Sequence, residues 1–391
     1  MTELERNALL PAGLRDVLPP DAAFESEIVE RLVGFFAARG YDRVRPPLIE
    51  FEDSLLSGAG VAVAPQTFRL MDPVSQRMMG VRADITPQIA RIARTRLAGS
   101  PRPLRLSYAG DVLRVRGSQL RPERQIIQVG AELIGSAAPA ADAEIIVMAV
   151  EAIAALGVAG ISVDLTVPRL VPTLFERHGL SGEAAVAIRA ALDRKDPAGV
   201  AALAGSASAL LTGLLAATGP VDDALATMGA LVLPDQAAAE RARVAEVVGL
   251  IRAAAPGMTL TLDPVEHRGF EYHTGIGFTI FAAGLSGELA GGGRYRARNG
   301  DGIAEDGERA TGVTLYVDTI LGTLRPHRRG RRILLPVATS AAEAARLRGD
   351  GWITVMALEP VADMKAEGER NGCSHILTKD GPRPVLEGPE T

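Results

Sequence analysis

The chain has 391 residues, of which 47% are hydrophobic and 23% are charged, so it can bury a large core and is not a disordered chain. Its length suits a large domain with one or two smaller ones. The formal net charge of −5 argues against a nucleic-acid-binding protein, which usually carries a basic surface. The single cysteine, Cys373, excludes an internal disulfide and a cysteine-based zinc site.

The N-terminus and the apolar stretches indicate neither secretion nor a membrane span. The first residues include acidic side chains and no apolar core of signal-peptide length. The most apolar helical stretch, residues 145–156, contains Glu151 and is too short to cross a bilayer. We therefore expect a soluble, cytoplasmic protein.

The first predicted elements are a helix and a strand that contains prolines. In residues 21–39 apolar side chains recur at helical spacing, and Gly40 follows as a stop signal. Residues 41–51 contain Pro46 and Pro47, which cannot donate hydrogen bonds to a neighbouring strand. We therefore expect an edge or interface strand in this segment.

Strand alternation in residues 125–134 predicts the floor of a pocket. Gln128, Gly130 and Glu132 fall on one face of this strand, and the two polar residues are about 13 Å apart at about 3.3 Å per residue. Gly130 is expected to leave room between them. Arg114, on the preceding predicted strand, is expected to reach the same face.

The remaining elements predict an α+β chain. Further strands are predicted at 104–116, 161–167, 258–266, 275–283 and 286–291, and further helices at 141–156 and 311–324. Alanine-rich helices are expected over residues 170–257. We expect residues 1–330 to form a core around a mostly antiparallel sheet flanked by helices, and residues 331–391 to form a small, truncated α/β domain.

Two segments with unusual composition allow more than one interpretation. The glycine-rich residues 290–295 are more typical of a tight turn than of a ligand loop, and their spacing is not that of a P-loop. Nine arginines lie between residues 91 and 124, against Asp111 and Glu123. Such a run could contact phosphates or nucleic acid, or could form solvated strand faces and subunit salt bridges.

Residues 267–273 combine two histidines, an arginine and a glutamate. No third ligand follows at a metal-binding spacing, so we predict no metal site. No Gly-x-Ser-x-Gly turn and no cysteine–histidine pair indicates a catalytic nucleophile.

Six motifs occur in the order found in histidyl-tRNA synthetases. They lie at residues 11–19, 40–50, 81–86, 108–132, 268–273 and 291–295. Residues 81–86 (VRADIT) resemble the loop that grips the amino group of histidine, and the last two motifs (RGFEYH and GGGRY) resemble the histidine-specific signatures. The chain therefore resembles this family over residues 11 to about 325. The resemblance implies a class II aminoacyl-tRNA synthetase-like core with a helical insertion and a small C-terminal α/β domain.

The resemblance also implies a largely retained histidine pocket. Arg268 stands at the position of the catalytic arginine of the family, and His273 stands where a tyrosine usually contacts the imidazole. Arg114 is expected to face the carboxylate of histidine or a phosphate. The candidate histidine-binding residues are Asp84, Thr86, Arg114, Gln128, Glu132, Arg268, Tyr272 and His273.

The ATP side departs from the family pattern. An arginine that holds the ATP phosphates is replaced by Thr319, which cannot donate a charged fork of hydrogen bonds. Arg116 replaces a glutamate that helps to hold adenine, and Arg296 replaces an aspartate. Loss of one such donor typically costs about 3 kcal/mol of transition-state stabilisation, so negligible adenylation is implied. The tail, residues 331–391, has eight basic and nine acidic side chains and is expected to bind tRNA poorly.

This combination resembles the ATP phosphoribosyltransferase regulatory subunits, a non-catalytic branch of the same family. The resemblance implies a short-form catalytic subunit as partner in a hetero-oligomer, with a hetero-octamer expected, and a homodimer through the core. Histidine is the expected regulatory ligand; no catalytic residue, cofactor, metal, nucleic acid or membrane is expected. Two alternatives remain open: a functional histidyl-tRNA synthetase with a divergent third motif, and a stand-alone amino-acid sensor or scaffold.

Overall fold

The computed structural model describes residues 9–117, 122–266, 273–297, 307–324 and 330–385. The chain divides into two compact units, Met1–Arg325 and Pro326–Thr391. No described helix is both long enough and apolar enough to span a bilayer.

The large unit is built on a mixed sheet, as the α+β prediction requires. In sheet order its strands are β1 (Asp42–Arg43), β5 (Leu104–Leu113), β6 (Gln125–Ile134), β12 (Glu308–Tyr316), β11 (Ala290–Ala297), β10 (His273–Ala282), β7 (Ile161–Thr166), β9 (Thr259–Asp263) and β8 (Gly219–Pro220). Among the described strands, β1–β5 and β7–β9 are parallel neighbours and the other neighbours are antiparallel. The predicted class of fold is therefore confirmed.

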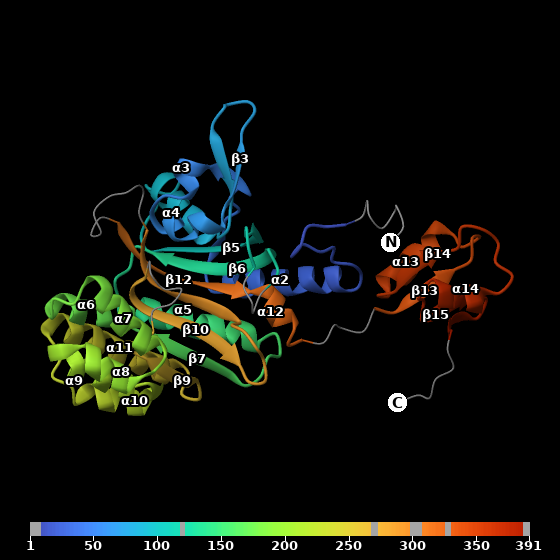
Figure 1. Cartoon of the computed structure of the whole chain (residues 1–391). Coiled ribbons are helices and arrows are strands. Elements are labelled where there is room, and N and C mark those ends of the chain that lie inside the picture. The colour runs from blue at the N-terminus through green and yellow to red at the C-terminus, as the bar shows by residue number, and fades with distance from the viewer. Residues whose placement is uncertain (1–8, 118–121, 267–272, 298–306, 325–329, 386–391) are drawn as a thin grey trace. The chain divides into compact units, whose positions relative to one another are not determined.

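Helices α2 (Asp21–Ala37) and α5 (Pro139–Ala154) cover one face of this sheet (Figure 1). Phe24, Ile28, Leu32 and Phe36 follow one another at helical spacing along α2, and all are buried. They belong to the same core as the side chains of β6 that alternate away from Glu132. The amphipathic helix predicted at residues 21–39 is therefore confirmed.

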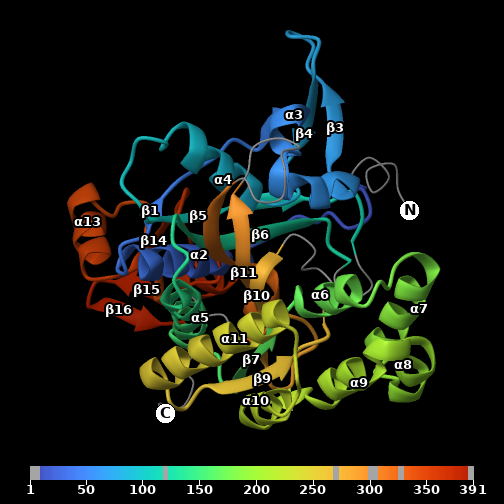
Figure 2. The ribbon, with the colours of Figure 1, turned by 90° about the vertical axis from the view of Figure 1, so that its left-hand side faces the viewer.

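The other face carries a smaller sheet, whose hairpin projects away from the large one (Figures 1 and 2). Its strands, in order, are β2 (Ile49–Phe51), β4 (Met78–Val81) and β3 (Phe68–Met71). The short helices α3 (Glu52–Leu55), η1 (Gly58–Gln66) and α4 (Thr86–Thr95) accompany it. Pro46 and Pro47 lie between β2 and the sheet-edge strand β1, which fits the expected edge position.

The alanine-rich segment forms helices packed at one end of the large sheet (Figure 2). They are α6 (Leu170–Arg177), α7 (Gly182–Asp193), α8 (Pro197–Leu203), α9 (Ser208–Ala216), α10 (Val221–Gly229) and α11 (Asp235–Ala254), with the short η2 (Gly205–Ala207) before α9. Asp196 caps α8 by accepting a hydrogen bond from the backbone N–H of Gly199.

Two sequence predictions were wrong near the C-terminal end of the large unit. The glycine cluster is not a turn: Gly291, Gly292 and Gly293 lie inside β11, between two antiparallel neighbours. A Cβ on Gly292 would lie 2.2 Å from the carbonyl oxygen of Gly312, so the glycines allow close strand approach. The helix predicted at 311–324 is instead β12 followed by the short helix α12 (Val317–Leu321), because residues 310–315 are buried in the sheet between β6 and β11.

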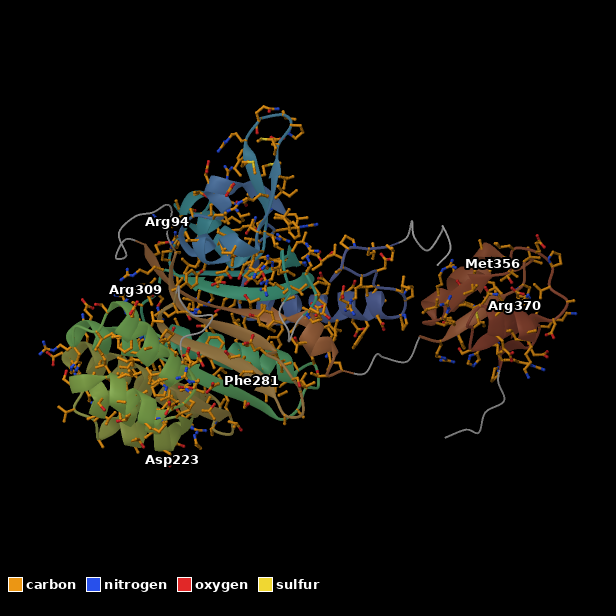
Figure 3. The ribbon with its side chains drawn as sticks, viewed as in Figure 1. Arg94, Asp223, Phe281, Arg309, Met356 and Arg370 are labelled. Atoms are coloured by element: carbon orange, nitrogen blue, oxygen red, sulfur yellow. The ribbon has the colours of Figure 1, made fainter. Side chains whose placement is uncertain are left out.

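The second unit contains a four-stranded sheet in the order β14 (Ile353–Met356), β13 (Arg332–Leu335), β15 (His375–Thr378) and β16 (Gly381–Pro384). Helices α13 (Ala341–Gly349) and α14 (Met364–Arg370) pack on it. Arg370, at the end of α14, is labelled in Figure 3. Ile333, Leu335, Leu347 and Trp352 form one of its small cores.

A buried ion pair connects the large sheet with two of its helices. The guanidinium of Arg294 on β11 donates to both carboxylate oxygens of Asp142 on α5, and both side chains are only 2% exposed. Arg294 also donates to the carbonyl oxygens of Ser136 and Ala138. Arg243 on α11 donates to Asp142 from the other side, at 3.3 Å. Nothing in the local sequence indicated this pairing.

We predict that Asp142→Ala lowers the free energy of unfolding by about 3–5 kcal/mol, because it leaves the guanidinium of Arg294 buried without its counter-ion. The measurement is urea unfolding followed by circular dichroism. Asp222→Ala serves as the control, because Asp222 pairs with Arg252 on the surface with its side chain 77% exposed. The control should change stability by less than about 1 kcal/mol; equal losses for both variants would show that burial of the ion pair does not matter.

Candidate functional site

The structure brings three of the predicted histidine-binding residues together at one small cavity. Thr86, Glu132 and His273 line it, along with glycines of β11 and β12. The remaining lining residues are Gly291, Gly292, Gly293, Tyr295, Gly312, Val313 and Thr314. The cavity therefore lies over the middle of the large sheet, between β6, β12 and β11.

Glu132 is the buried acid of this cavity and is 1% exposed. The hydroxyl of Tyr295 donates to its Oε2 at 2.9 Å, and the hydroxyl of Thr86 donates to its Oε1 at 3.1 Å. Burial nevertheless raises the pKa of Glu132 to about 8, since the cost of desolvating the carboxylate exceeds the stabilisation from these bonds. At neutral pH the side chain is therefore largely protonated.

Tyr108 on β5 fills the space that the sequence prediction left for a ligand. A Cβ at Gly130 would lie 2.3 Å from the phenol ring and hydroxyl of Tyr108, so the expectation that Gly130 opens a pocket is wrong. The fully buried Tyr108 hydroxyl hydrogen-bonds Thr86 at 3.2 Å and Thr314 at 2.8 Å. The sequence could have indicated this contact only through the pairing of β5 with β6, in which Tyr108 lies directly opposite Gly130.

These hydroxyls form a chain whose direction depends on the proton of Glu132. With Glu132 ionised, Thr86 donates to the carboxylate. With Glu132 protonated, the carboxyl can donate to Thr86, which can then donate to Tyr108, because either of those two hydroxyls can act as donor. Protonation of one buried acid thus reorients the polar groups along the cavity wall.

His273 contributes a neutral imidazole to the cavity. It lies at the start of β10, and its side chain is buried. Burial lowers the pKa of His273 to about 3, because the imidazolium form cannot be solvated there. A Cβ at Gly293 would lie 2.9 Å from this ring, so the glycine of β11 is what lets the imidazole reach the cavity.

Of the other predicted site residues that the structure describes, Asp84, Arg114 and Gln128 do not line the cavity. The amide of Gln128 accepts a hydrogen bond from the backbone N–H of Ile85 at 3.1 Å, which holds the loop before α4. Asp84 accepts one from the backbone N–H of Thr86 at 2.9 Å, and burial raises the pKa of Asp84 despite the nearby charge of Arg114. Arg268 and Tyr272 lie outside the described residues.

The cavity is small in this conformation. Its volume is about 10 Å³, measured as room for the centre of a water molecule, which is enough for about one water. A bound amino acid therefore requires movement of a wall. The hydroxyl-bearing side chains Thr86, Tyr108 and Tyr295 are the groups whose displacement would enlarge it.

A second group of side chains, which the sequence analysis did not identify, holds Pro46 and Pro47 in place by hydrogen bonds. Arg82, whose side chain is buried, donates from Nε to the carbonyl oxygen of Asp111 at 2.7 Å and from Nη1 to that of Pro46 at 3.1 Å. Gln88 donates to the carbonyl oxygen of Pro47 at 2.8 Å and to the carboxylate of Glu50 at 2.9 Å. The segment between β1 and β2 is thus fixed by Arg82, from the loop before α4, and by Gln88 in the first turn of α4, the helix that begins at Thr86.

The residue before Thr319, Asp318, has an acidic environment. Asp318, in the first turn of α12, accepts a hydrogen bond from the backbone N–H of Ile127 at 3.2 Å and lies 3.7 Å from Arg15. Burial raises the pKa of Asp318. Among the described residues, the cavity beside Asp318 is lined by four carboxyl groups, those of Glu25, Asp111, Glu123 and Asp318, and by Arg15. Such a wall disfavours a polyphosphate.

The other two replacements on the ATP side lie in different environments. Arg116 is exposed, and its backbone N–H, not its guanidinium, donates to the side chain of Gln66 at 3.4 Å. Arg296 is partly buried and donates to the carbonyl oxygen of Gly307 at 3.4 Å. The described structure therefore places no forked arginine at the position of Thr319.

The arginine run proves to be largely structural where it is described. Arg102 forms a bidentate ion pair with Glu308, at 2.7 and 3.0 Å, and Arg105 forms one with Glu144, at 2.9 Å for both bonds. Arg91 pairs with Glu50, and Arg94 donates to the carbonyl oxygen of Ala297 (Figure 3). The interpretation as strand faces with salt bridges is favoured over a phosphate-binding stripe.

No three histidine, cysteine, aspartate or glutamate side chains converge as a metal site within the described ranges. Residues 267–272 of the histidine-rich segment lie outside those ranges.

We predict that the stability of the chain depends on pH through Glu132. The folded state keeps a proton that the unfolded chain releases above its ordinary pKa of 4.5. This contribution to stability is complete below about pH 4.5 and is lost as pH rises through about 8, with a slope of up to about 1.4 kcal/mol per pH unit. Glu132→Gln, which stays neutral, should flatten this fall in the free energy of unfolding.

The measurement is urea unfolding at pH values from 5 to 9, with Glu246→Gln on the exposed face of α11 as control. If the Glu132 and Glu246 variants keep the same pH dependence as the unchanged chain, Glu132 does not hold the buried proton.

Comparison with known proteins gives the relationship of this chain. The sequence pattern of the family described as histidyl-tRNA synthetase matches residues 13–320. The ATP phosphoribosyltransferase regulatory subunit of Paramagnetospirillum magneticum is 57% identical over 381 residues, covering 97% of this chain and 99% of the relative. That of Rhodospirillum centenum is 58% identical over 369 residues, covering 94% of each.

Among solved structures, the fold is similar to an ATP phosphoribosyltransferase regulatory subunit/histidyl-tRNA synthetase from Bacillus halodurans. The TM-score is 0.79 at 24% identity, and the match covers 93% of this chain and 96% of the other. This likeness establishes the shared fold.

Proposed function

This chain belongs to the histidyl-tRNA synthetase-like family of ATP phosphoribosyltransferase regulatory subunits, and from this premise we propose that it binds a separate short-form catalytic subunit and regulates it without carrying out chemistry itself. One observation carries the proposal: the histidine side of the synthetase-like site keeps its buried acid, whereas the described cavity beside Asp318, the residue before Thr319, is lined by four carboxyl groups and by Arg15. The alternative of an active histidyl-tRNA synthetase is not favoured.

We further propose that histidine binds at the cavity of Glu132. Glu132 is a buried carboxyl group that can be protonated or ionised, and it lies beside hydroxyl groups and the neutral imidazole of His273. Such a set of groups can recognise a ligand that both donates and accepts hydrogen bonds, as histidine does. Because the cavity has room for only about one water molecule, binding must be coupled to movement of its walls. A ligand that binds the opened state better shifts the population toward that state, which is the requirement for regulation.

A homodimer through the core is supported by exposed apolar side chains on and beside the projecting hairpin. Leu48 is 47% exposed, Met71 53% and Val74 90%. Monomeric proteins rarely leave such side chains clustered in water. We propose that this surface, together with the segment that contains Pro46 and Pro47, contacts a second copy of this chain. We further propose that such dimers assemble with catalytic subunits into a hetero-octamer.

The unchanged chain should show no histidine-dependent exchange of pyrophosphate into ATP. Electrostatic stabilisation of the transferring group is usually the largest single catalytic contribution, and its arginine donor is replaced by Thr319. The measurement is a pyrophosphate-exchange assay on the pure protein, with a histidyl-tRNA synthetase as positive control. Exchange above background would contradict the regulatory proposal and restore the synthetase alternative.

Glu132→Gln should weaken histidine binding by roughly tenfold, about 1.4 kcal/mol, because the amide cannot ionise to match the ligand's cationic groups. Isothermal calorimetry on the pure chain measures it. Glu308→Gln is the matched control, since that carboxylate pairs with Arg102 and does not line the cavity. An affinity equal to that of the unchanged chain would place the regulatory histidine elsewhere.

A further inference from the structure

The cavity surrounds the carboxyl group of Glu132 with hydroxyl groups and provides it with no counter-ion. Tyr295 and Thr86 both donate to it from hydroxyl groups. Within the described part of the chain, Glu132 forms no ion pair with a lysine, arginine or histidine. A carboxylate that is 1% exposed loses its hydration, and here it gains no positive charge in return. The ionised form of Glu132 is therefore the unfavourable one.

A second carboxyl group lies against the same threonine. The backbone N–H of Thr86 donates to Asp84 at 2.9 Å, and the hydroxyl of Thr86 donates to Glu132 at 3.1 Å. Burial and, to a smaller extent, the charge of Asp84 raise the pKa of Glu132 to about 8. Burial raises the pKa of Asp84 as well. Two carboxyl groups on either side of one threonine disfavour a second negative charge, so the pair keeps a proton at neutral pH.

The other elements around the cavity do not compensate this charge. Tyr108 on β5 stays neutral, because burial raises its pKa well above the ordinary value. His273 on β10 also stays neutral, because burial lowers its pKa to about 3. Strands β11 and β12 line the cavity with glycines, a tyrosine and a threonine. The positive charge of Arg114 acts on Asp84, where burial nevertheless outweighs it.

The carboxyl group of Glu132 lies inside the cavity itself. It extends over Gly312 of β12, where a Cβ would lie 1.8 Å from its Oε2. A ligand that enters the cavity therefore contacts this group directly. An ammonium group carries one positive charge and can donate three hydrogen bonds, which the two carboxyl groups and the hydroxyl of Thr86 can accept. A positive charge within about 4–6 Å favours the ionised form of a carboxyl group.

We infer that the Glu132 cavity takes the ammonium group of its ligand in exchange for a proton, so that histidine binding releases a proton and strengthens as pH rises. The inference rests on the proposed function and adds to it the charge state of the bound ligand and the pH dependence of its binding. The proton passes from Glu132 to a base in solution, and the ammonium nitrogen keeps its three protons. The hydroxyl of Thr86 suits both states, since it can accept from the protonated carboxyl group and donate to the carboxylate.

The experiment counts the protons released when histidine binds to the full-length chain. Isothermal calorimetry at pH 7.0 in Pipes, Hepes and Tris gives this count, because the three buffers differ in their enthalpy of ionisation. With a pKa of about 8, Glu132 is about 0.9 protonated before binding. The unchanged chain should therefore release about 0.9 proton more than Glu132→Gln, and this difference removes the titration of the ligand itself. Glu308→Gln, at a carboxylate that pairs with Arg102, should match the unchanged chain.

Two further measurements decide between the outcomes. Between pH 6.5 and 7.5, the affinity of the unchanged chain relative to that of Glu132→Gln should rise about eightfold. A ligand without the ammonium group, 3-(imidazol-4-yl)propionate, tests the unchanged chain alone and remains decisive if Glu132→Gln does not fold. It should bind at least about tenfold more weakly than histidine and should release no proton from Glu132.

Three results would overturn the inference. Equal proton counts for the unchanged chain and a folded Glu132→Gln variant overturn it and leave the proposed function intact. An equal proton count for histidine and for the ligand without the ammonium group also overturns it, because the imidazole then displaces the proton. If histidine does not bind the unchanged chain at all, the proposed histidine site fails and the inference fails with it.

Discussion

The buried ion pair between Arg294 and Asp142 is the constraint on which the rest of the large unit depends. It fixes the start of α5 against β11, and Arg243 extends the same network to α11. A buried charge without its partner is strongly unfavourable, so these elements cannot separate without losing much of the stability of the fold. Because side chains alternate along a strand, fixing Arg294 on one face also fixes Tyr295 on the other, against Glu132.

The two sides of the synthetase-like site have opposite character. The histidine side keeps a buried carboxyl with an elevated pKa, hydroxyl partners and a neutral imidazole. On the ATP side, a threonine stands at position 319, and the described cavity beside Asp318 is lined by four carboxyl groups and by Arg15. The proposed role, binding histidine without activating it, agrees with the relatives' name of regulatory subunit.

The fold and part of the site could be predicted from the sequence because local signals carry them. Helical spacing located α2, strand alternation placed Glu132 on the cavity face, and motif order brought in Thr86 and His273. Tyr108 and Arg294 could not be found this way, since each acts through a partner distant in sequence: Gly130 across a strand pair, and Asp142 in another element.

The glycine cluster could not be predicted from local sequence for the same reason. Glycine usually marks turns. Here β12 lies so close to β11 that a Cβ at Gly292 would clash with it, and this contact explains why glycines occupy a central strand. The helix predicted at 311–324 failed for a related reason: residues 310–315 of β12 are all buried, and the polar Thr311 and Thr314 are among them, so the strand shows no clean alternation of apolar and polar residues.

The central claim is that this chain regulates a separate catalytic subunit and responds to histidine. The most direct measurement is the ATP phosphoribosyltransferase activity of the purified short-form catalytic subunit, with and without this chain, across a histidine titration. The account predicts that the chain alone is inactive, that its addition changes the activity of the catalytic subunit, and that histidine inhibits the mixture more than it inhibits the catalytic subunit alone. Identical activity and identical histidine response with and without the chain would contradict it.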